Sequence, residues 1–423
     1  MTSDPQILFI DHTGELAGGQ LCLADIAIRL RNQCQVFLFQ SGPFRELLEK
    51  NGVVVALPNR ESGTLSVRKK SKWLAYLGSI PVLISLVFNL VRLAKGFDLL
   101  YANTAKALMV SVPVALLLRK PLLFHLHDIV GPQHFNRLNS WLLVTGANLA
   151  TGIMANSEAS AAAYRQAGGK NGNLKVVPNG FPVERFQADV TELSQRLRES
   201  FGDEDQPVVG LFGRIAVWKG QKVLVEALSK LRQVSGIIVG EALFTEEDQQ
   251  YKKEVVALAE KLGVSNRLRL IGFQADVLPY LEAVDVVVHC SISPEPFGRV
   301  IVEAQLAGKP VIATKGGGPS EIIEDRVTGI LVSPNNSDEL AGAIKKLLEN
   351  RKWAEELATN GRQAAVQRFG LESVFKEWTA FIYQNASVAT KLRSAGEGEP
   401  ELQSSSVTPT LDSSTGPRPG KGQ

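Results

Sequence analysis

The sequence predicts an α/β protein with two domains, each built on a parallel sheet in a Rossmann-like arrangement. Short apolar segments alternate with amphipathic helical segments over residues 1–180, and the same alternation returns over residues 207–368. A polar stretch of weak periodicity, residues 181–206, lies between them and indicates a connector. The 423 residues are sufficient for two hydrophobic cores. We therefore expect two domains that face each other across a cleft.

Composition and charge exclude several broad classes of protein. Apolar residues make up 44% of the chain and charged residues 21%, with a net charge of +3, which favours a soluble globular protein over a disordered chain or a dedicated nucleic-acid binder. Cys22, Cys34 and Cys290 are too scattered for a disulfide framework or a zinc site, so we expect buried thiols in a reducing compartment. The polar opening lacks a basic leader and a cleavable apolar region, which favours a cytoplasmic protein.

The first domain opens with an apolar strand over residues 7–10, a loop with three glycines and a helix over residues 20–32. The loop glycines do not have the GxGxxG spacing, and Gln40 and Ser41 follow the next strand where an acid would bind a ribose. This pattern disfavours a dinucleotide and leaves a loop for phosphate or for an acceptor. We interpret the loop residues His12 and Glu15 as solvated rather than catalytic.

Residues 68–91 have the most unusual composition. A basic cluster (Arg68, Lys69, Lys70 and Lys72) precedes residues 73–91, which carry no charge. Their length would permit a membrane span, but Pro81 and several polar residues interrupt the run, which lies between two strands of one domain. We expect a pair of helices inside the domain or on its surface. The alternatives are a helix that dips into one leaflet beside anionic lipids and, less favoured, a span.

The later strands of this domain bring polar residues to one sheet edge. The strand over residues 121–126 delivers His125, His127 and Asp128 to its carboxyl end, where parallel α/β sheets bind ligands. A histidine beside an acid can act there as a base or orient a substrate, and the alternative is a hydrogen-bonded core histidine. No third ligand has a spacing that would indicate a metal site. Ser157, after the next strand, is a good helix N-cap residue.

The connector contains an acidic run, and two cations follow it. Asp203, Glu204 and Asp205 spell a DxD pattern, which we interpret as a solvated charge run rather than a metal site because its surroundings are hydrophilic. The strand over residues 208–212 ends before Arg214 and Lys219. Two cations at this spacing can grip two phosphates, although surface cations after a strand are the plainer alternative.

The densest chemistry lies between residues 295 and 323. Gly298 precedes a helix over residues 300–307, and the first turn of such a helix presents free N–H groups that suit a phosphate. Glu295 lies before the helix and Glu303 about two turns along it, at roughly 3.6 residues per turn, so the two carboxylates can reach a sugar and a ribose of one ligand. The plainer alternative is an ordinary loop and helix with solvated acids.

A strand over residues 311–314 runs into three glycines, 316–318, where we expect the backbone to approach a ligand closely. Two helices follow a last strand. We expect a terminal helix over residues 369–387 that returns to the first domain. Residues 388–423 are rich in Gly, Ser, Thr and Pro and have too few large apolar side chains to order, so we interpret them as a tail.

Together these segments resemble the retaining glycosyltransferases of family four, the group 1 glycosyl transferases, over roughly residues 5–385. The residues that carry the resemblance are the two glutamates Glu295 and Glu303 around Pro296, Phe297 and Gly298, the segments AxxxGKPVIAT at 304–314 and GRxxxxKG at 213–220, the pair His127 and Asp128, the NS pair at 156–157 and VPNG at 177–180. One departure lies before Glu321, where the proline is shifted by one position.

The resemblance implies the GT-B fold and the transfer of a hexose from a nucleoside diphosphate sugar with retention of configuration. It implies that His127 lies at the reaction centre, that Arg214 and Lys219 neutralise the diphosphate, and that Glu295 contacts the transferred sugar. Glu303 would accept ribose hydroxyls. The implied donor-binding set is Gly19, Gly213, Gly240, Phe297, Gly298, Arg299, Val300 and Glu303.

The expected partners are a UDP- or GDP-sugar donor, a saccharide or lipid-linked acceptor and an anionic surface at the inner face of the membrane, met by residues 68–94. No nucleic acid, cofactor or essential metal is expected. Two alternatives remain. One is a non-catalytic nucleotide-sugar binding protein, and the other is a different GT-B enzyme such as a nucleotide-sugar epimerase or a phosphorylase, although no cofactor lysine for a phosphorylase is recognisable.

Overall fold

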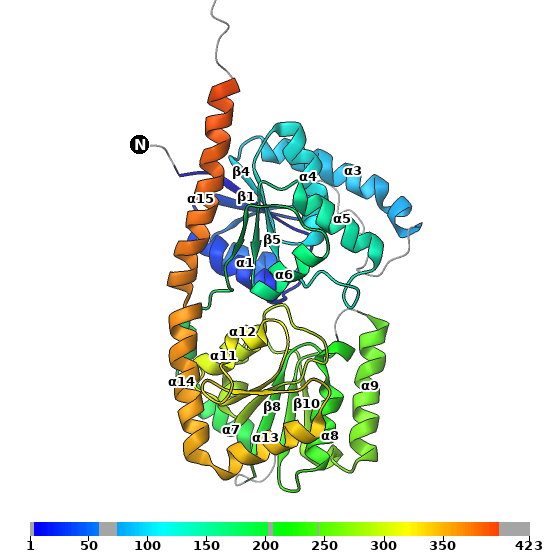
Figure 1. Ribbon diagram of the computed structural model, residues 1–423, viewed down its shortest axis with the longest axis vertical. Coiled ribbons are helices and arrows are strands. Elements are labelled where there is room, and N and C mark those ends of the chain that lie inside the picture. The colour runs from blue at the N-terminus through cyan, green and yellow to red at the C-terminus, as the bar shows by residue number, and fades with distance from the viewer. Residues whose placement is uncertain (1–3, 59–73, 202–205, 243–244, 397–423) are drawn as a thin grey trace, which may run out of the picture.

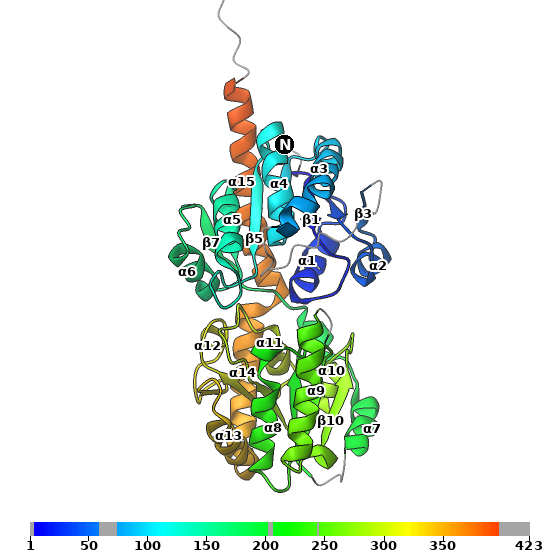
Figure 2. The same ribbon diagram turned by 90° about the vertical axis from the view of Figure 1, so that its right-hand side faces the viewer.

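The computed structural model describes residues 4–58, 74–201, 206–242 and 245–396, which form two α/β domains stacked end to end (Figures 1 and 2). The first sheet has seven strands in the order β3-β2-β1-β4-β5-β6-β7, and the second has six in the order β10-β9-β8-β11-β12-β13. Every strand pair within the two sheets is parallel. The expected two-domain GT-B architecture is therefore confirmed.

The strands of the first domain are β1 (Ile7–Asp11), β2 (Cys34–Leu38), β3 (Val54–Ala56), β4 (Leu99–Ala102), β5 (Leu122–Leu126), β6 (Gly152–Ala155) and β7 (Leu174–Val176). Its helices are α1 (Gly18–Arg29), α2 (Pro43–Lys50), α3 (Leu74–Ala94), α4 (Ala105–Leu118), α5 (Arg137–Asn148) and α6 (Glu158–Gln166). The connector holds η1 (Val183–Gln187) and α7 (Thr191–Phe201).

The strands of the second domain are β8 (Val208–Phe212), β9 (Ser235–Val239), β10 (Leu268–Gly272), β11 (Val286–His289), β12 (Val311–Thr314) and β13 (Ile330–Val332). Its helices are η2 (Val217–Lys219), α8 (Gln221–Ser229), α9 (Glu246–Lys261), η3 (Ser265–Arg267), α10 (Leu278–Glu282), α11 (Arg299–Leu306), α12 (Pro319–Ile322), α13 (Ser337–Glu349) and α14 (Arg351–Phe369), and α15 (Leu371–Gly396) ends the described chain.

Both sheets are buried on both faces, because alternate residues of each strand enter different cores. In β1, Leu8 and Ile10 pack under α3, α4 and α5, whereas Ile7 and Phe9 pack under α1, α2 and α15. The second sheet repeats this pattern, with α8, α9 and α13 on one face and α7, α10 and α11 on the other. The apolar strands predicted from the sequence are apolar because helices cover both of their sides.

Residues 74–94 form one helix, α3, so the expected helix pair is wrong. Pro81 lies inside α3 without ending it. Leu86, Leu90 and Ala94 recur every four residues and are fully buried against the first sheet, which gives the helix one continuous seam of packing. This outcome agrees with the interpretation of a domain-surface helix. The basic cluster Arg68, Lys69, Lys70 and Lys72, with Trp73, lies outside the described residues.

The chain crosses between the domains twice, and the two crossings pair with each other. Phe181 donates its N–H to the carbonyl of Phe369 and accepts from the N–H of Leu371, both at 2.9 Å. Beyond this point α15 lies along the first domain, as expected for the terminal helix (Figure 1). It continues to Gly396 instead of ending near residue 387. The indole N–H of Trp378, 1% exposed, donates to the Tyr101 hydroxyl at 3.0 Å.

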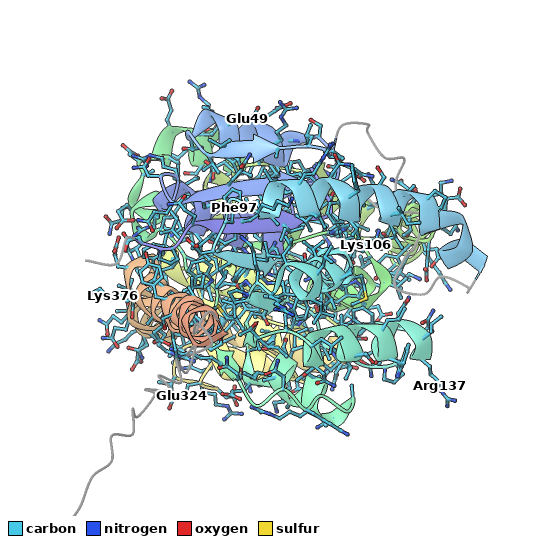
Figure 3. All side chains as sticks on the ribbon, turned by 90° about the horizontal axis from the view of Figure 1, so that it is seen from above. Glu49, Phe97, Lys106, Arg137, Glu324 and Lys376 are labelled. Atoms are coloured by element: carbon cyan, nitrogen blue, oxygen red, sulfur yellow. The ribbon has the colours of Figure 1, made fainter. Side chains whose placement is uncertain are left out.

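Two further interpretations lie outside the described residues, namely the DxD run Asp203, Glu204 and Asp205 and most of the proposed tail, residues 397–423. In the view from above, Arg137 at the start of α5 and Lys376 on α15 mark opposite sides of the first domain (Figure 3). Among the described residues, no helix combines the length and the hydropathy that crossing a bilayer requires.

Candidate active site

The carboxyl ends of both sheets face the boundary between the domains, and side chains meet across it. The ideal position of a Cβ at Gly18, at the start of α1, would lie 3.0 Å from Cδ of Arg299, at the start of α11. The Ser157 hydroxyl donates to the Pro296 carbonyl at 2.5 Å. The rings of His134 and Trp218 also meet, with centroids 6.1 Å apart. The loops that the sequence singled out are therefore brought together.

Glu295 is the centre of a buried polar cluster in the second domain. Its Oε2 accepts from Lys219 Nζ at 2.7 Å and from the Ser291 hydroxyl at 3.0 Å, and lies 3.3 Å from Nε2 of His289. Burial alone would raise the pKa of Glu295, but Lys219 and His289 outweigh it and hold this pKa well below its ordinary value. Glu295 is therefore an ionised hydrogen-bond acceptor and not a general acid.

His289 and Ser291 belong to this site but were not singled out from the sequence. Ser291 Oγ lies 3.0 Å from His289 Nε2, and the two side chains are 2% and 3% exposed. His289 Nδ1 is buried and has no hydrogen-bond partner among the described residues. A proton on Nδ1 would therefore be an unsatisfied buried donor, so the neutral ring with its proton on Nε2 fits best. The only sequence signal was the position of His289 at a strand's carboxyl end.

Lys219 is held by contact between two loops. Its Nζ lies 4.3 Å from the centre of the Trp218 ring, and the Trp218 carbonyl accepts from the N–H of Ile292 at 2.8 Å. Gly220 has φ +68°, and an added Cβ would lie 2.1 Å from the carbonyl oxygen of Cys290. Only glycine allows this approach, which brings Lys219 to Glu295. The guanidinium of Arg214 lies on the same indole, 5.8 Å from its centre.

The glycine run approaches protein backbone and not a ligand, so that expectation is wrong at two of its positions. A Cβ at Gly317 would lie 2.1 Å from the Glu295 carbonyl oxygen, and one at Gly318 would lie 2.2 Å from that of Phe297. A bridge joins Glu295 to Gly317. These glycines therefore support the loop that carries Glu295. Gly240 also approaches protein backbone, because an added Cβ there would lie 2.0 Å from the Gly213 carbonyl oxygen.

The start of α11 fits the predicted phosphate seat. Gly298 has φ +100° and no side chain caps the helix, so the first N–H groups are available to an anion. The side chains of Phe297 and Val300, assigned to donor binding above, instead enter the core. The Phe297 ring packs between those of Phe181 and Phe369, at 6.3 and 5.7 Å. These two residues can reach a donor only through their backbone.

Arg299 connects the two domains electrostatically. Its Nη2 lies 3.5 Å from Glu303 Oε1, and its guanidinium lies 4.5 Å from the centre of the Phe181 ring. Its positive charge also acts on Asp25 of α1. Burial raises the pKa of Asp25 to about 6, and Arg299 opposes this rise. Glu303 is thus already oriented by a neighbouring cation.

His127 and His125 occupy different environments, which resolves the two interpretations given above. Their ring centroids are 3.8 Å apart. His125 is a core residue, 3% exposed, with Nδ1 2.8 Å from the Tyr101 hydroxyl. His127 lies at the sheet edge, where its Nε2 is 3.0 Å from Asn103 Oδ1. A Cβ at Gly19 would lie 3.4 Å from the His127 ring, so Gly19 leaves space for this ring.

A second bridge between the domains was only partly predicted. Both oxygens of Glu321 accept backbone N–H groups at the start of α6, from Glu158 at 2.9 Å and from Ala159 at 2.7 Å. Ser157 caps the same helix, as predicted, by accepting from the N–H of Ser160. The negative charge of Glu321 suits the positive end of α6.

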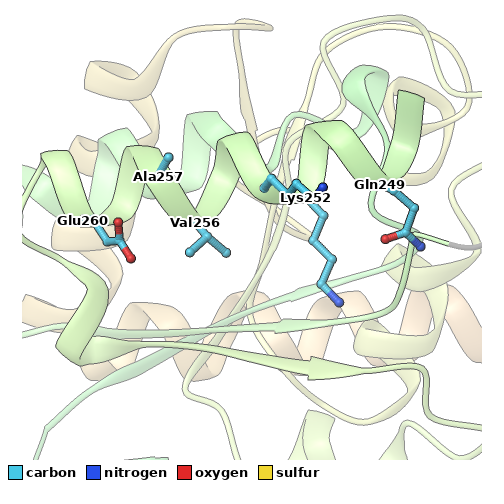
Figure 4. A pocket seen from close by; sticks show the side chains of 6 residues that line it. Gln249, Lys252, Val256, Ala257 and Glu260 are labelled. Carbon is cyan, nitrogen blue, oxygen red and sulfur yellow. The ribbon is translucent and has the colours of Figure 1, made fainter. Parts of the chain in front are cut away.

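A shallow pocket lies away from these groups, along α9 (Figure 4). Its lining comes from that helix alone and includes Lys252 and Glu260. Lys252 is already paired with Glu241, at 2.6 Å. Among the described residues, no group of three or more histidine, cysteine or acidic side chains is placed to hold a metal ion.

Comparison with known proteins identifies the family. The model of Glycosyltransferase Family 4 matches residues 17–185, and that of Glycosyl transferases group 1 matches residues 194–364. HepE of Anabaena, solved with UDP and glucose, is 38% identical to this chain, with a TM-score of 0.79 over 92% of this chain and 100% of its own. The chain belongs to glycosyltransferase family 4.

Other members of the family agree with this assignment. The lipopolysaccharide core biosynthesis glycosyltransferase LpsE of Rhizobium meliloti is 36% identical over 170 residues, which are 40% of this chain and 48% of LpsE. A GDP-mannose-dependent phosphatidylinositol monomannoside mannosyltransferase of Mycolicibacterium smegmatis is 29% identical over 49% of this chain and 55% of its own. The matched region spans about half the length of these curated relatives.

Proposed function

We propose that this family 4 glycosyltransferase transfers a hexose from a nucleoside diphosphate sugar to a saccharide or lipid-linked acceptor, with retention of configuration and without an essential metal. The observation that carries the proposal is the buried cluster of Lys219, Glu295, His289 and Ser291 beside the uncapped start of α11. The start of α11 offers an anion-binding site, and Glu295 offers an ionised acceptor for a sugar hydroxyl. Both lie on the side of the second domain that faces His127.

Each end of the donor has a matching group. The free N–H groups after Gly298 would take a phosphate, and Arg214 and Lys219 would stabilise the charge that develops on the departing diphosphate. Glu303, oriented by Arg299, would accept the ribose hydroxyls. The three donors on Oε2 of Glu295 leave Oε1 for a sugar hydroxyl.

UDP-glucose is the proposed donor. The support is the identity of 38% to HepE, whose structures were solved in complex with UDP and glucose and with UDP-glucose. The GDP-mannose-dependent relative is less similar, at 29%. The names of LpsE and the mannosyltransferase support a lipid-linked saccharide as the acceptor class.

A donor panel tests the proposal. UDP-, GDP- and ADP-sugars are compared by thermal shift, because a ligand bound at 100 times its Kd adds about 2.7 kcal/mol to the stability of the folded state. Release of the nucleoside diphosphate is then measured with the donor that binds. UDP-glucose should raise the Tm most and UDP should be released. Binding without release would favour the non-catalytic alternative, and no binding by any donor would contradict the proposal.

Retention and metal independence are checked in the same assay. The anomeric configuration of the product, read by NMR, should equal that of the donor. Turnover should continue in excess chelator. An inverted product would contradict retention, and a loss of turnover that magnesium reverses would contradict metal independence.

We also propose that the enzyme is cytoplasmic and works at an anionic membrane surface, which suits a lipid-linked acceptor. Adjacent outer helices of the first domain carry large apolar side chains that are more than half exposed, namely Ile84 and Phe88 on α3, Leu116 and Leu117 on α4, and Trp141 on α5. The guanidinium of Arg92 lies 4.7 Å from the Phe88 ring. Exposed apolar groups beside a cation suit the interface of an anionic bilayer.

Liposome sedimentation tests this surface. The wild type should sediment with vesicles rich in anionic lipid at low salt and remain in solution with neutral vesicles. The variant Phe88→Ser/Trp141→Ser should bind more weakly. Val256→Ser is the matched control, because Val256 is also exposed but lies on α9 of the other domain. Wild-type protein that does not bind anionic vesicles at low salt would contradict the proposal.

A further inference from the structure

Three adjacent strands end in one buried hydrogen-bonded chain that leads to His127. Strand β4 pairs with both β1 and β5, so Asp11, Asn103 and His127 meet at the same sheet edge. Asp11 and Asn103 are fully buried, at 0% exposure. Asn103 Nδ2 donates to Asp11 Oδ2 at 2.6 Å, and Asn103 Oδ1 lies 3.0 Å from His127 Nε2.

The amide of Asn103 can take only one orientation. Its Nδ2 also faces the Gly19 carbonyl at 3.2 Å, and a carbonyl and a carboxylate are both acceptors. A flipped amide would place the fully buried Oδ1 against two acceptors. Asp11 stays ionised, because His12, whose Nδ1 lies 3.4 Å from Asp11 Oδ1, and hydrogen bonds from Asn103 and Gln20 outweigh its burial and lower its pKa.

The fixed amide determines where His127 holds its proton. Oδ1 of Asn103 can only accept, so Nε2 of His127 must donate. The ring is neutral, because burial lowers the pKa of His127 to about 4, and Arg299 also lowers it while Asp128 and Asp11 oppose the shift. A neutral ring with a proton on Nε2 has none on Nδ1.

The neighbouring ring, that of His125, is neutral for the same reason. The Tyr101 hydroxyl accepts the indole N–H of Trp378 and lies 2.8 Å from His125 Nδ1. Burial lowers the pKa of His125 well below its ordinary value. His127 therefore stacks on an uncharged ring.

We propose that Asp11 and Asn103 are positioning residues that fix His127 in the tautomer protonated on Nε2. His127 then presents Nδ1 as a hydrogen-bond acceptor, which suits a hydroxyl of a bound sugar and not a phosphate oxygen. The hydroxyl partner rests on the proposed glycosyl transfer, whereas the tautomer does not. Asp11 and Asn103 are not catalytic residues, because they act through His127.

Nitrogen NMR of histidine-labelled protein tests the tautomer directly. The chain has only five histidines, so the spectrum is sparse, and His127→Gln identifies the His127 signals. In the wild type at neutral pH, Nε2 of His127 should have the shift of a protonated nitrogen and Nδ1 that of an unprotonated one. A proton on Nδ1, or on both nitrogens, would overturn the proposal. The tautomer is read on the wild-type protein and needs no substrate.

Variants then test the chain of contacts. Asp11→Asn should let the Asn103 amide turn, so that the His127 signals shift towards a mixture of tautomers. The exchange Asp11→Asn/Asn103→Asp should restore Nε2 protonation, because the carboxylate at 103 again accepts from His127. Gln20→Leu is the control, since it removes a donor to Asp11 without touching Asn103. Unchanged His127 shifts in a folded Asp11→Asn variant would also contradict the proposal.

Activity separates this proposal from the proposed function. If the enzyme transfers a sugar, Asp11→Asn should lower kcat at least tenfold with an unchanged Kd for UDP, and the exchange variant should recover part of kcat. If the wild type turns over no donor while its spectrum shows the expected tautomer, the proposed function fails and the positioning inference stands.

Discussion

At the scale of single residues, the site depends on charges that are buried together. Lys219 and Glu295 have side chains only 15% and 11% exposed and lie 2.7 Å apart. A buried charge without its partner destabilises the folded state more than the removal of both charges does. The reason is that no ion pair then offsets the free energy of taking the charge out of water. The pair therefore serves stability and charge placement at once, and substitutions can separate the two roles.

Lys219→Met should lower the stability of the second domain by about 3–5 kcal/mol, because Glu295 loses its main partner. The double variant Lys219→Met/Glu295→Gln should recover most of this stability. Both variants should lose turnover by a factor of about 10²–10³, because Arg214 alone then meets the leaving diphosphate. Thermal unfolding and nucleotide release measure the two effects.

Lys222→Met is the control for this pair, because Lys222 makes an exposed ion pair with Glu254 in the same region. It should change stability by less than about 1 kcal/mol and leave turnover intact. If Lys219→Met/Glu295→Gln is as unstable as Lys219→Met, the unpaired charge of Glu295 is not what destabilises the single variant, and the prediction is wrong.

The pH dependence of stability reports the burial of His127. Its folded pKa is about 4 and the ordinary value is 6.5, so the unfolded chain binds the proton more tightly. The stability that the neutral, buried His127 contributes is present above pH 6.5. It is lost as the pH falls towards 4, at about 1.4 kcal/mol per pH unit. Asp25 has a raised pKa of about 6 and opposes this slope below pH 6.

Comparison with His127→Gln isolates the histidine, because Asp25 is present in both proteins. Between pH 6.5 and 4.5, the wild type should lose about 2–3 kcal/mol relative to the variant. Urea unfolding at several pH values measures the difference. Parallel curves for the two proteins would mean that His127 titrates normally.

The residues missed from the sequence share one property. Asp11 and Asn103 lie far apart in the chain and meet only because β4 lies beside β1. The sequence showed a polar residue at each strand end but not which strands are neighbours. His289 was hidden in the same way, as the last residue of an apolar strand. Glu295 and Lys219 were recognised because they belong to sequence motifs of the family.

At the scale of elements, hydrophobic periodicity predicted the strands and most helices well, because helices bury both sheets on both faces. It failed for α3, where composition suggested a break that packing overrides. Glycines showed a second limit. A run of three glycines indicates close approach but does not say what approaches, and here Gly317 and Gly318 meet backbone.

Gly220 and Gly263 form a matched pair that separates close approach from backbone strain. Their φ angles are +68° and +67°, but an added Cβ meets the Cys290 carbonyl at Gly220 and nothing within 4 Å at Gly263. Gly263→Ala should cost about 1–2 kcal/mol through strain alone. Gly220→Ala should cost more and should weaken UDP binding, because the Lys219 loop must move.

Urea unfolding and UDP titration of both variants measure these effects. Equal losses of stability, with UDP binding unchanged in Gly220→Ala, would mean that the contact between the loops of Lys219 and Cys290 does not hold the site.

At the scale of the whole molecule, the site lies where two domains meet, and polar contacts between described residues bridge them. The paired crossings at Phe181 and Phe369 form one side of the boundary. Arg299 reaches Gly18, and Glu321 binds the start of α6. A few polar contacts that bridge two independently packed cores suit domains that separate to exchange ligands.

Glu321 is the contact whose removal should loosen the domains with the least damage to either core. Each of its oxygens accepts one N–H at the positive end of α6, an arrangement worth about 1–2 kcal/mol. Glu321→Ala should therefore raise the population of open molecules by a factor of about 5–30. The expected signs are a larger radius of gyration by X-ray scattering and a higher KM for the donor.

Glu324→Ala is the matched control, because Glu324 is exposed two residues beyond α12 and its hydrogen bonds within the described part of the chain use only its backbone. It should leave both measurements at wild-type values. Saturating UDP-glucose should return the Glu321→Ala radius towards that of the wild type, since a donor whose nucleotide binds the second domain and whose sugar meets His127 of the first favours the closed form. If Glu321→Ala scatters like the wild type without ligand, the crossings and Arg299 suffice to close the molecule, and the carboxylate serves α6 alone.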